Sequence, residues 1–151
     1  MANVPAAPDD AFVGKTLTMH VLDCSADSFK VPFHVGEDHS RTWLLTAKGD
    51  RLQLKHEHRH ADGKLDELTN YGGLSVAQSS AKRVEFPVDD ESKALFSATG
   101  RQVSMTNVWA LELDRNHQFI YELTRPGRVF RVAFDLAKPV TLPTPSNVKA
   151  Y

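Results

Sequence analysis

The segment 51–60 alternates between two kinds of side chain. Its even-numbered positions begin with two leucines and end with three of the chain's seven histidines: Leu52, Leu54, His56, His58 and His60. Its odd-numbered positions are all polar or charged. Because successive side chains of a β-strand point to opposite faces, the pattern predicts a half-buried strand. The leucines and the histidines are therefore predicted to face the protein interior.

A two-residue alternation recurs along most of the chain, interrupted by turn-forming residues. Strands are predicted over residues 15–22, 42–47, 52–60, 65–71, 82–86, 102–113, 118–124 and 129–136, with a further short strand around 29–34. Asp62-Gly63 is a strong hairpin signal, and the stretch 48–50 is typical of a tight turn. Gly72-Gly73 is expected to form a bulge or a bend.

One stretch has helical character. Acidic residues at 89–91 suit a helix N-terminus and Gly100 suits its end, so a short helix is predicted near residues 89–97. The fold is therefore predicted to be all-β: roughly eight antiparallel strands in an up-and-down β-barrel, with one short helix. A closed barrel leaves no unpaired edge, and a barrel of about eight strands can hold one small ligand. A β-sandwich is the alternative.

The length of 151 residues suits one domain. Residues 12–138 are predicted to form a single barrel domain. Residues 1–11, which contain two prolines and an acidic pair, are predicted to be a flexible N-terminal arm. Residues 139–151, which contain three prolines, are predicted to be an extended C-terminal tail.

Composition argues against several classes of protein. The formal net charge is −1, so no basic excess indicates a nucleic-acid partner. No apolar run is long enough to span a bilayer, and membrane insertion is not expected. The first ten residues lack the charged start and apolar run of a signal peptide, although their Ala, Pro and Asp content is typical of a mature exported chain. Cys24 is the only cysteine, which excludes an internal disulfide.

The histidine row is the main candidate site. Histidines two residues apart on a strand have Cα atoms roughly 6.6 Å apart, so His56 and His58 can converge on one metal ion. Zinc or another divalent transition metal would need further ligands from elsewhere in the chain. The candidates for these ligands are His20, His34, His39, His117, Glu112 and Asp66. Alternatively, the imidazoles contact a small molecule or line a polar interior. In each case they form a cluster expected to titrate near pH 6.5.

Two other residues are candidates for ligand contact. The hairpin at residues 62–63 returns Tyr71 towards the histidine strand, where a Tyr–His pair can serve acid–base chemistry. Arg131 lies opposite the apolar face of segment 129–136. If that face fills the interior, Arg131 lies outside; if it packs elsewhere, Arg131 lines the cavity and can bind a carboxylate or phosphate. The polar stretch 33–43 is a candidate ligand loop, and Trp109 is expected in the core.

Four segments carry a resemblance to known proteins: 29–43, 56–63, 71–73 and 125–132. Together they resemble a family of small, uncharacterised bacterial β-proteins, many of which are exported. The resemblance covers most of the chain after the N-terminal arm. It implies a periplasmic or secreted location and no particular activity. The predicted strand count is also similar to that of the lipocalin and avidin barrels, a likeness at the level of fold.

Three functions are compatible with these candidates. The first is a binding protein whose pocket holds a small-molecule ligand through His56, His58, His60, Tyr71 and Arg131. The second is an enzyme, either a lyase, an isomerase or a metal-assisted hydrolase, in which one histidine is the base and Asp66 or Glu112 orients it. The third is a structural or interaction protein with a polar barrel interior. No phosphate-binding loop, nucleophile elbow or CxxC motif is present. The sequence identifies neither the ligand nor the oligomeric state.

Overall fold

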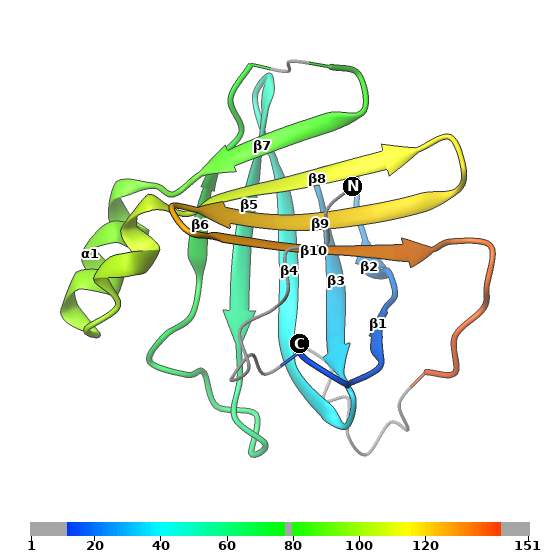
Figure 1. The fold of residues 1–151 in the computed structure, drawn as a ribbon, viewed down its shortest axis with the longest axis horizontal. Helices are drawn as coiled ribbons and strands as arrows, with labels where there is room; N and C mark the ends of the chain where they lie inside the picture. Colours follow the sequence, from blue (N-terminus) through cyan, green and yellow to red (C-terminus); the bar gives the residue numbers. More distant parts are fainter. Residues whose placement is uncertain (1–11, 78–79, 143–151) are drawn as a thin grey trace.

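The computed structural model describes residues 12–77 and 80–142. The predicted arm at 1–11 and most of the predicted tail, residues 143–151, lie outside the described residues. Within the described residues, ten strands form two antiparallel sheets, which run across one another in Figure 1. The predicted all-β class and its antiparallel pairing are therefore confirmed.

The first sheet contains six strands. Five are hydrogen-bonded in the order β1 (Leu17–Met19), β3 (Ser28–Val35), β4 (Asp38–Lys48), β5 (Arg51–His58) and β6 (Tyr71–Leu74). The sixth, β2 (Leu22–Cys24), also pairs with β3. The second sheet contains four strands in the order β10 (Arg128–Asp135), β9 (Gln118–Arg125), β8 (Val108–Asp114) and β7 (Arg83–Pro87).

The sheets do not close into the predicted barrel. Their outer strands β1 and β10 do not pair, and the two sheets face each other across a shared core, as in the alternative sandwich. The predicted strand over 15–22 is divided into β1 and β2, and both pair with β3 in the first sheet. At the opposite corner, backbone hydrogen bonds still link the region of β6 to that of β7. Val76 N–H donates to Glu85 at 3.0 Å, and Asp89 N–H donates to Gly72 at 2.9 Å.

Gly72 and Gly73 lie within β6 and not in the predicted bulge or bend. Both positions pass too close to other backbone for a side chain. A Cβ on Gly72 would lie 1.8 Å from the carbonyl oxygen of Leu54, and one on Gly73 would lie 1.8 Å from that of Pro87. Gly72 thus lies against β5 and Gly73 against Pro87 of β7. In the register of β6 with β5, Tyr71 lies opposite His56.

One predicted loop and one predicted strand also differ from the structure. The stretch 33–43 is the end of β3, a turn and the start of β4, so it is a hairpin and not a loop. Residues 65–70 are not a strand, and only Leu65 makes an isolated bridge, with Arg59. By contrast, the predicted tight turn at 48–50 is confirmed by the hairpin between β4 and β5.

The helix α1 (Asp90–Ala98) confirms the predicted helix. Asp89 caps its N-terminus, because its carboxylate accepts a hydrogen bond from the Ser92 N–H at 2.8 Å. The buried Ser92 hydroxyl bonds to Gly72, which ties α1 to the sheet. The chain then forms the 3₁₀ helix η1 (Gln102–Thr106), where the sequence predicts a strand. In ranges 12–77 and 80–142, no helix has the length and apolar character needed to cross a membrane.

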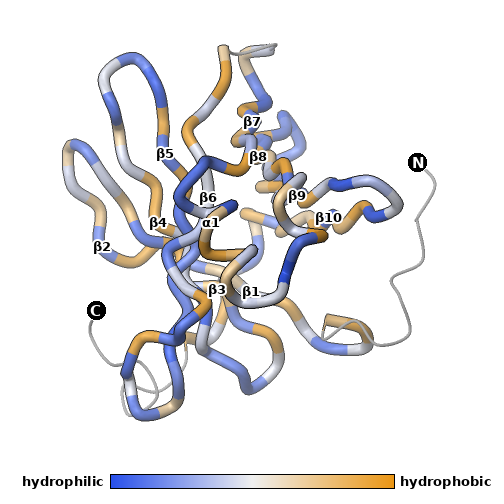
Figure 2. Tube along the Cα trace, turned by 90° about the vertical axis from the view of Figure 1, so that its left-hand side faces the viewer, coloured by the Kyte–Doolittle hydropathy of each residue, from blue (hydrophilic) through white to orange (hydrophobic). Residues whose placement is uncertain are grey.

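The core lies between the two sheets and is rich in aromatic side chains. The rings of Trp43 and Tyr121 stack with centroids 4.5 Å apart, and Trp109 is buried as predicted. The apolar face of β10, which includes Phe134, packs into this core. Hydrophobic and hydrophilic residues accordingly alternate along the strands in Figure 2.

Candidate functional site

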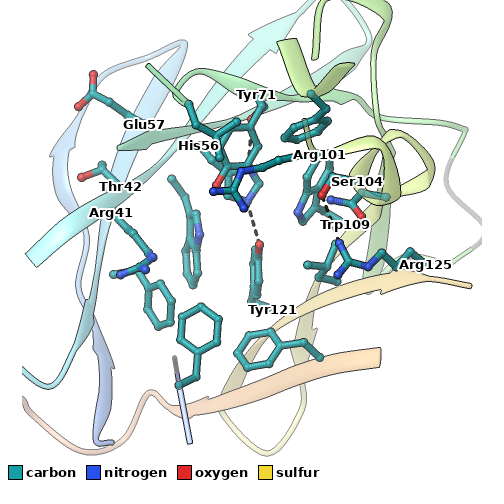
Figure 3. A pocket seen from close by; sticks show the side chains of 18 residues that line it. Arg41, Thr42, His56, Glu57, Tyr71, Arg101, Ser104, Trp109, Tyr121 and Arg125 are labelled. Carbon is teal, nitrogen blue, oxygen red and sulfur yellow. Dashed lines mark hydrogen bonds between the residues drawn. The ribbon is translucent and has the colours of Figure 1, made fainter. Parts of the chain in front are cut away.

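A cavity of about 200 Å³ lies between the sheets beside α1 and η1. Its inner wall is largely aromatic and comes from strands of both sheets: Trp43 (β4), Tyr71 (β6), Trp109 (β8) and Tyr121 (β9). Three arginines line its more exposed side: Arg41, Arg101 and Arg125. Figure 3 shows Arg101 and Arg125 reaching the cavity from one side and Arg41 from the other. The cavity thus combines an apolar interior with a cationic rim.

His56 is held in the inner wall by hydrogen bonds on both ring nitrogens. Nδ1 lies 3.0 Å from the carbonyl oxygen of Tyr71, which can only accept, so Nδ1 carries the proton and donates it. Nε2 therefore accepts a hydrogen bond from the Tyr121 hydroxyl, 2.8 Å away (Figure 3). The His56 ring also stacks on that of Tyr71 with centroids 5.0 Å apart. Packing and hydrogen bonds together hold one orientation of the imidazole.

The inner wall carries no charge at neutral pH. Burial lowers the pKa of His56 from 6.5 to about 4, because removal from water disfavours the imidazolium. Burial also raises the pKa of Tyr71 above 10 and that of Tyr121 well above 10, so both phenols stay protonated. The predicted titration of the histidine row near pH 6.5 therefore does not hold for His56.

The 3₁₀ helix η1 and its two flanking residues supply polar side chains to the cavity. Arg101, Ser104 and Asn107 are three residues apart, and in a 3₁₀ helix such positions lie above one another. All three line the cavity. A strand over 102–113 would have placed Ser104 on the face opposite to Arg101 and Asn107.

The three arginines differ in their charge partners. Arg41 forms an ion pair with Asp38, with Nη1 and Oδ2 2.6 Å apart. Arg125 donates a hydrogen bond to Oγ of Ser104 at 3.2 Å. Within the described residues, neither Arg101 nor Arg125 forms an ion pair with a carboxylate. One side of the rim therefore has positive charge that no neighbouring carboxylate pairs with.

Asn107 is 4% exposed, and its side-chain Oδ1 is buried without a hydrogen-bond partner in the described part of the chain. Buried polar atoms are nearly always paired, and an unpaired one costs about 1–3 kcal/mol. Asn107 is also one of the residues that line the cavity, so this unpaired amide lies in the cavity wall.

The structure brings together two of the five predicted ligand residues, His56 and Tyr71. His58 lies beyond the cavity, with Nε2 2.9 Å from Oγ of Ser40 and Nδ1 3.7 Å from the carboxylate of Asp66. The side chain of His60 is 59% exposed and also lies 3.7 Å from Asp66.

Arg131 does not line the cavity. It lies on the outer face of the second sheet, where its guanidinium is 2.6 Å from both Glu112 and Glu122. Phe130, Val132 and Phe134 of β10 face the core, so Arg131, which alternates with them along the strand, faces away from it. The sequence had left both orientations of this strand open.

The predicted metal pair of His56 and His58 is not completed by a third ligand. No cluster of three or more metal-ligating side chains is placed to hold an ion in residues 12–77 and 80–142. Residues 56–60 do read His-Glu-x-x-His, a spacing that on an α-helix places two histidines beside one zinc. Here His56 lies in a strand and is buried, whereas His60 is exposed, so the two do not face one ion.

Three of the histidines named as further metal ligands form a separate chain of contacts. His34 Nε2 lies 3.3 Å from Nδ1 of His20, and His34 Nδ1 lies 2.8 Å from Nδ1 of His39. Since His34 uses nitrogens on different sides of its ring, the three rings do not converge on one point. Burial, together with His39 and His20, lowers the pKa of His34 to about 4.

Sequence reasoning missed the polar half of the cavity. The three-residue spacing of Arg101, Ser104 and Asn107 was a signal for a 3₁₀ face, but the apolar residues between them also fit a strand. No pattern in the sequence places Arg125 beside Ser104, because that contact depends on how β9 packs against η1.

No family model, curated protein or solved structure matches the chain.

Proposed function

We propose that the protein binds a small molecule in the cavity between its two sheets. The observation that carries the proposal is the cavity itself, a space of about 200 Å³ among large aromatic side chains. Side chains in protein interiors normally interdigitate and leave few voids larger than a water molecule. Ligand pockets, by contrast, are mostly apolar and contain a few polar groups that orient the ligand. The aromatic wall and the cationic rim match that description.

The volume limits the size of the ligand. An apolar cavity of about 150 Å³ accommodates benzene, so this cavity suits one ring with a short substituent. A planar ring can stack on the rings of Trp43, Trp109 or Tyr121.

The environment of His56 supports binding in preference to acid–base catalysis. Its Nδ1 proton is donated to Tyr71, and its Nε2 lone pair accepts the Tyr121 proton. Neither nitrogen is left to take a proton from a bound molecule without breaking one of these hydrogen bonds. His56 therefore serves as part of the cavity wall in this proposal.

A fluorescence titration tests the proposal, because both tryptophans of the chain, Trp43 and Trp109, line the cavity. The probes are benzyl alcohol, 3-phenylpropanamide and 3-phenylpropionate. We expect at least one of them to change the tryptophan emission in a saturable way and to raise the melting temperature. A ligand present at 100 times its dissociation constant stabilises the folded protein by about 2.7 kcal/mol, which a melting curve resolves.

Two variants of η1 separate binding in the cavity from binding elsewhere. Ser104→Phe fills the cavity with a ring, whereas Thr106→Phe adds the same ring at an exposed position of the same helix that does not line it. Ser104→Phe is expected to abolish the response, and Thr106→Phe is expected to keep it. A folded Ser104→Phe variant that binds like the wild type would contradict the proposal, as would the absence of any response in the wild type.

A further inference from the structure

We infer that the ligand of the cavity is a small aromatic carboxylic acid that also carries a hydrogen-bond donor, with its carboxylate bound between Arg101 and Arg125. The inference rests on the proposed function, since it names the class of molecule that the same cavity takes. An aromatic 2-hydroxy acid has the required groups: a ring, a carboxylate and a neighbouring hydroxyl.

The charge balance around the cavity is the first observation. Several other arginines of the described structure are paired with carboxylates: Arg41 with Asp38, Arg83 with Glu122, and Arg131 with both Glu112 and Glu122. Arg101 and Arg125 are the arginines of the cavity for which the described residues provide no ion-paired carboxylate. The planar fork of a guanidinium matches a carboxylate and can bind it through two hydrogen bonds.

The acidic side chains near the cavity are engaged with other groups. Glu57 contributes to the lining but points away from the cavity centre in Figure 3 and pairs with Arg59 at 3.1 Å. Asp66 lies 3.7 Å from His58 and from His60 and is not ion-paired with Arg101, although it lies within electrostatic range of it. Burial lowers the pKa of Arg125, and the charge of Arg128 lowers it further, so the Arg125 guanidinium is a destabilised cation. An anionic ligand would relieve this imbalance.

The buried amide of Asn107 is the second and independent observation. Its Oδ1 has no partner in the described residues, and the side chain lines the cavity. An amide oxygen needs a donor, so a carboxylate alone would leave it unpaired. Asn107 lies one 3₁₀ turn, about 6 Å along the axis, from Ser104, whose hydroxyl contacts Arg125. That spacing suits a hydroxyl close to the carboxylate of one ligand.

The rest of the cavity orients the molecule. Trp43, Trp109 and Tyr121 lie deep between the sheets and are almost fully buried, whereas Arg101 is exposed. The ring of the ligand would therefore enter first, and the carboxylate would stay at the rim. An ammonium group beside the carboxylate would meet the two arginines, so a hydroxy acid fits better than an amino acid.

Matched ligands test the inference. The set consists of 3-phenylpropanamide, 3-phenylpropionate, 3-phenyllactate and benzylphosphonate, each titrated by calorimetry. Because charge-assisted hydrogen bonds are the stronger ones, phenylpropionate is expected to bind at least about tenfold more tightly than the amide. Phenyllactate is expected to bind more tightly than phenylpropionate, and this second gain should disappear in Asn107→Leu.

The arginines are tested with a double variant, Arg101→Gln with Arg125→Gln, which should bind the acid no more tightly than the amide. Arg115→Gln removes an exposed arginine remote from the cavity lining and should keep the preference for the acid. Equal affinities for amide and acid in the wild type would overturn the inference and leave the proposed function standing. Tighter binding of the phosphonate would overturn the carboxylate class. If none of the four ligands binds, the proposed function itself fails.

Discussion

Acidification should weaken the fold through His56. This imidazole is buried in its neutral form, donates to Tyr71 at 3.0 Å and accepts from Tyr121 at 2.8 Å. A proton on Nε2 would face the proton of the Tyr121 hydroxyl, so that hydrogen bond would have to break or reverse. Protonation would also leave a positive charge in an aromatic environment, where it is poorly solvated.

The size and the sign of the effect follow from the two pKa values. His56 titrates at 6.5 in an unfolded chain and at about 4 in the folded protein. Between these values the unfolded state binds the proton and the folded state does not, so stability rises with pH. The contribution of His56 is fully present above pH 6.5 and is lost as the pH falls through about 4. A shift of this size corresponds to about 3 kcal/mol in the free energy of unfolding.

The assay is urea unfolding followed by tryptophan fluorescence at several pH values between about 7 and 4. His56→Phe removes the titrating group, so its free energy of unfolding should fall less over this range than that of the wild type. Other titrating groups, including His34 and the carboxylates, contribute to both proteins and cancel in the comparison. His60→Gln is the control, because the His60 side chain is mostly exposed, and it should keep the wild-type dependence.

One result would refute this reasoning. If the wild type and His56→Phe lose the same free energy between pH 7 and pH 4, the imidazole of His56 does not titrate differently in the folded and unfolded states. The hydrogen-bonded neutral form described above would then be incorrect.

Two further predictions concern the corner where the sheets meet. Gly73→Ala would place a Cβ 1.8 Å from the backbone oxygen of Pro87, which no rotamer change can relieve, so urea unfolding should show a loss of about 3 kcal/mol or more. Gly49→Ala, in open space at a φ of +64°, should lose only about 1–2 kcal/mol, and equal losses would argue against the clash. Asp89→Ala should cost about 1 kcal/mol through the lost N-cap of α1, whereas Asp89→Asn, which keeps the cap but not the charge beside Lys55, should cost less in the same assay. If the two Asp89 variants lose the same free energy, the charge and not the cap is what matters there.

Local pattern correctly placed two residues of the inner wall of the cavity, His56 and Tyr71. The alternation of 51–60 correctly predicted that His56 faces inward, because a strand's side-chain period does not depend on its neighbours. The return of the chain after Asp62-Gly63 correctly brought Tyr71 beside His56, although through the short strand β6 and not through a strand over 65–71. The acidic cap before α1 is likewise a local signal.

Pattern failed where a residue's environment depends on distant segments. Leu52, His58 and His60 share the parity of His56 but are not buried as it is. Leu52 is 37% exposed, the His58 side chain is half-buried and that of His60 is 59% exposed. Periodicity alone did not determine whether Arg131 of β10 faces the core or the solvent. The packing of Phe134 in the core shows that Arg131 faces outward.

The sequence by itself therefore determined the all-β class, the antiparallel hairpins, the helix α1 and the inward side of the histidine strand, because each depends on side-chain period or on turn and cap chemistry within a few residues. Only the tertiary structure decided that the sheets stay open between β1 and β10, and that Arg101, Ser104, Asn107 and Arg125 meet over an aromatic cavity. Those outcomes depend on packing and pairing between segments that are far apart in the chain. Local side-chain periodicity does not determine the energies of these long-range contacts.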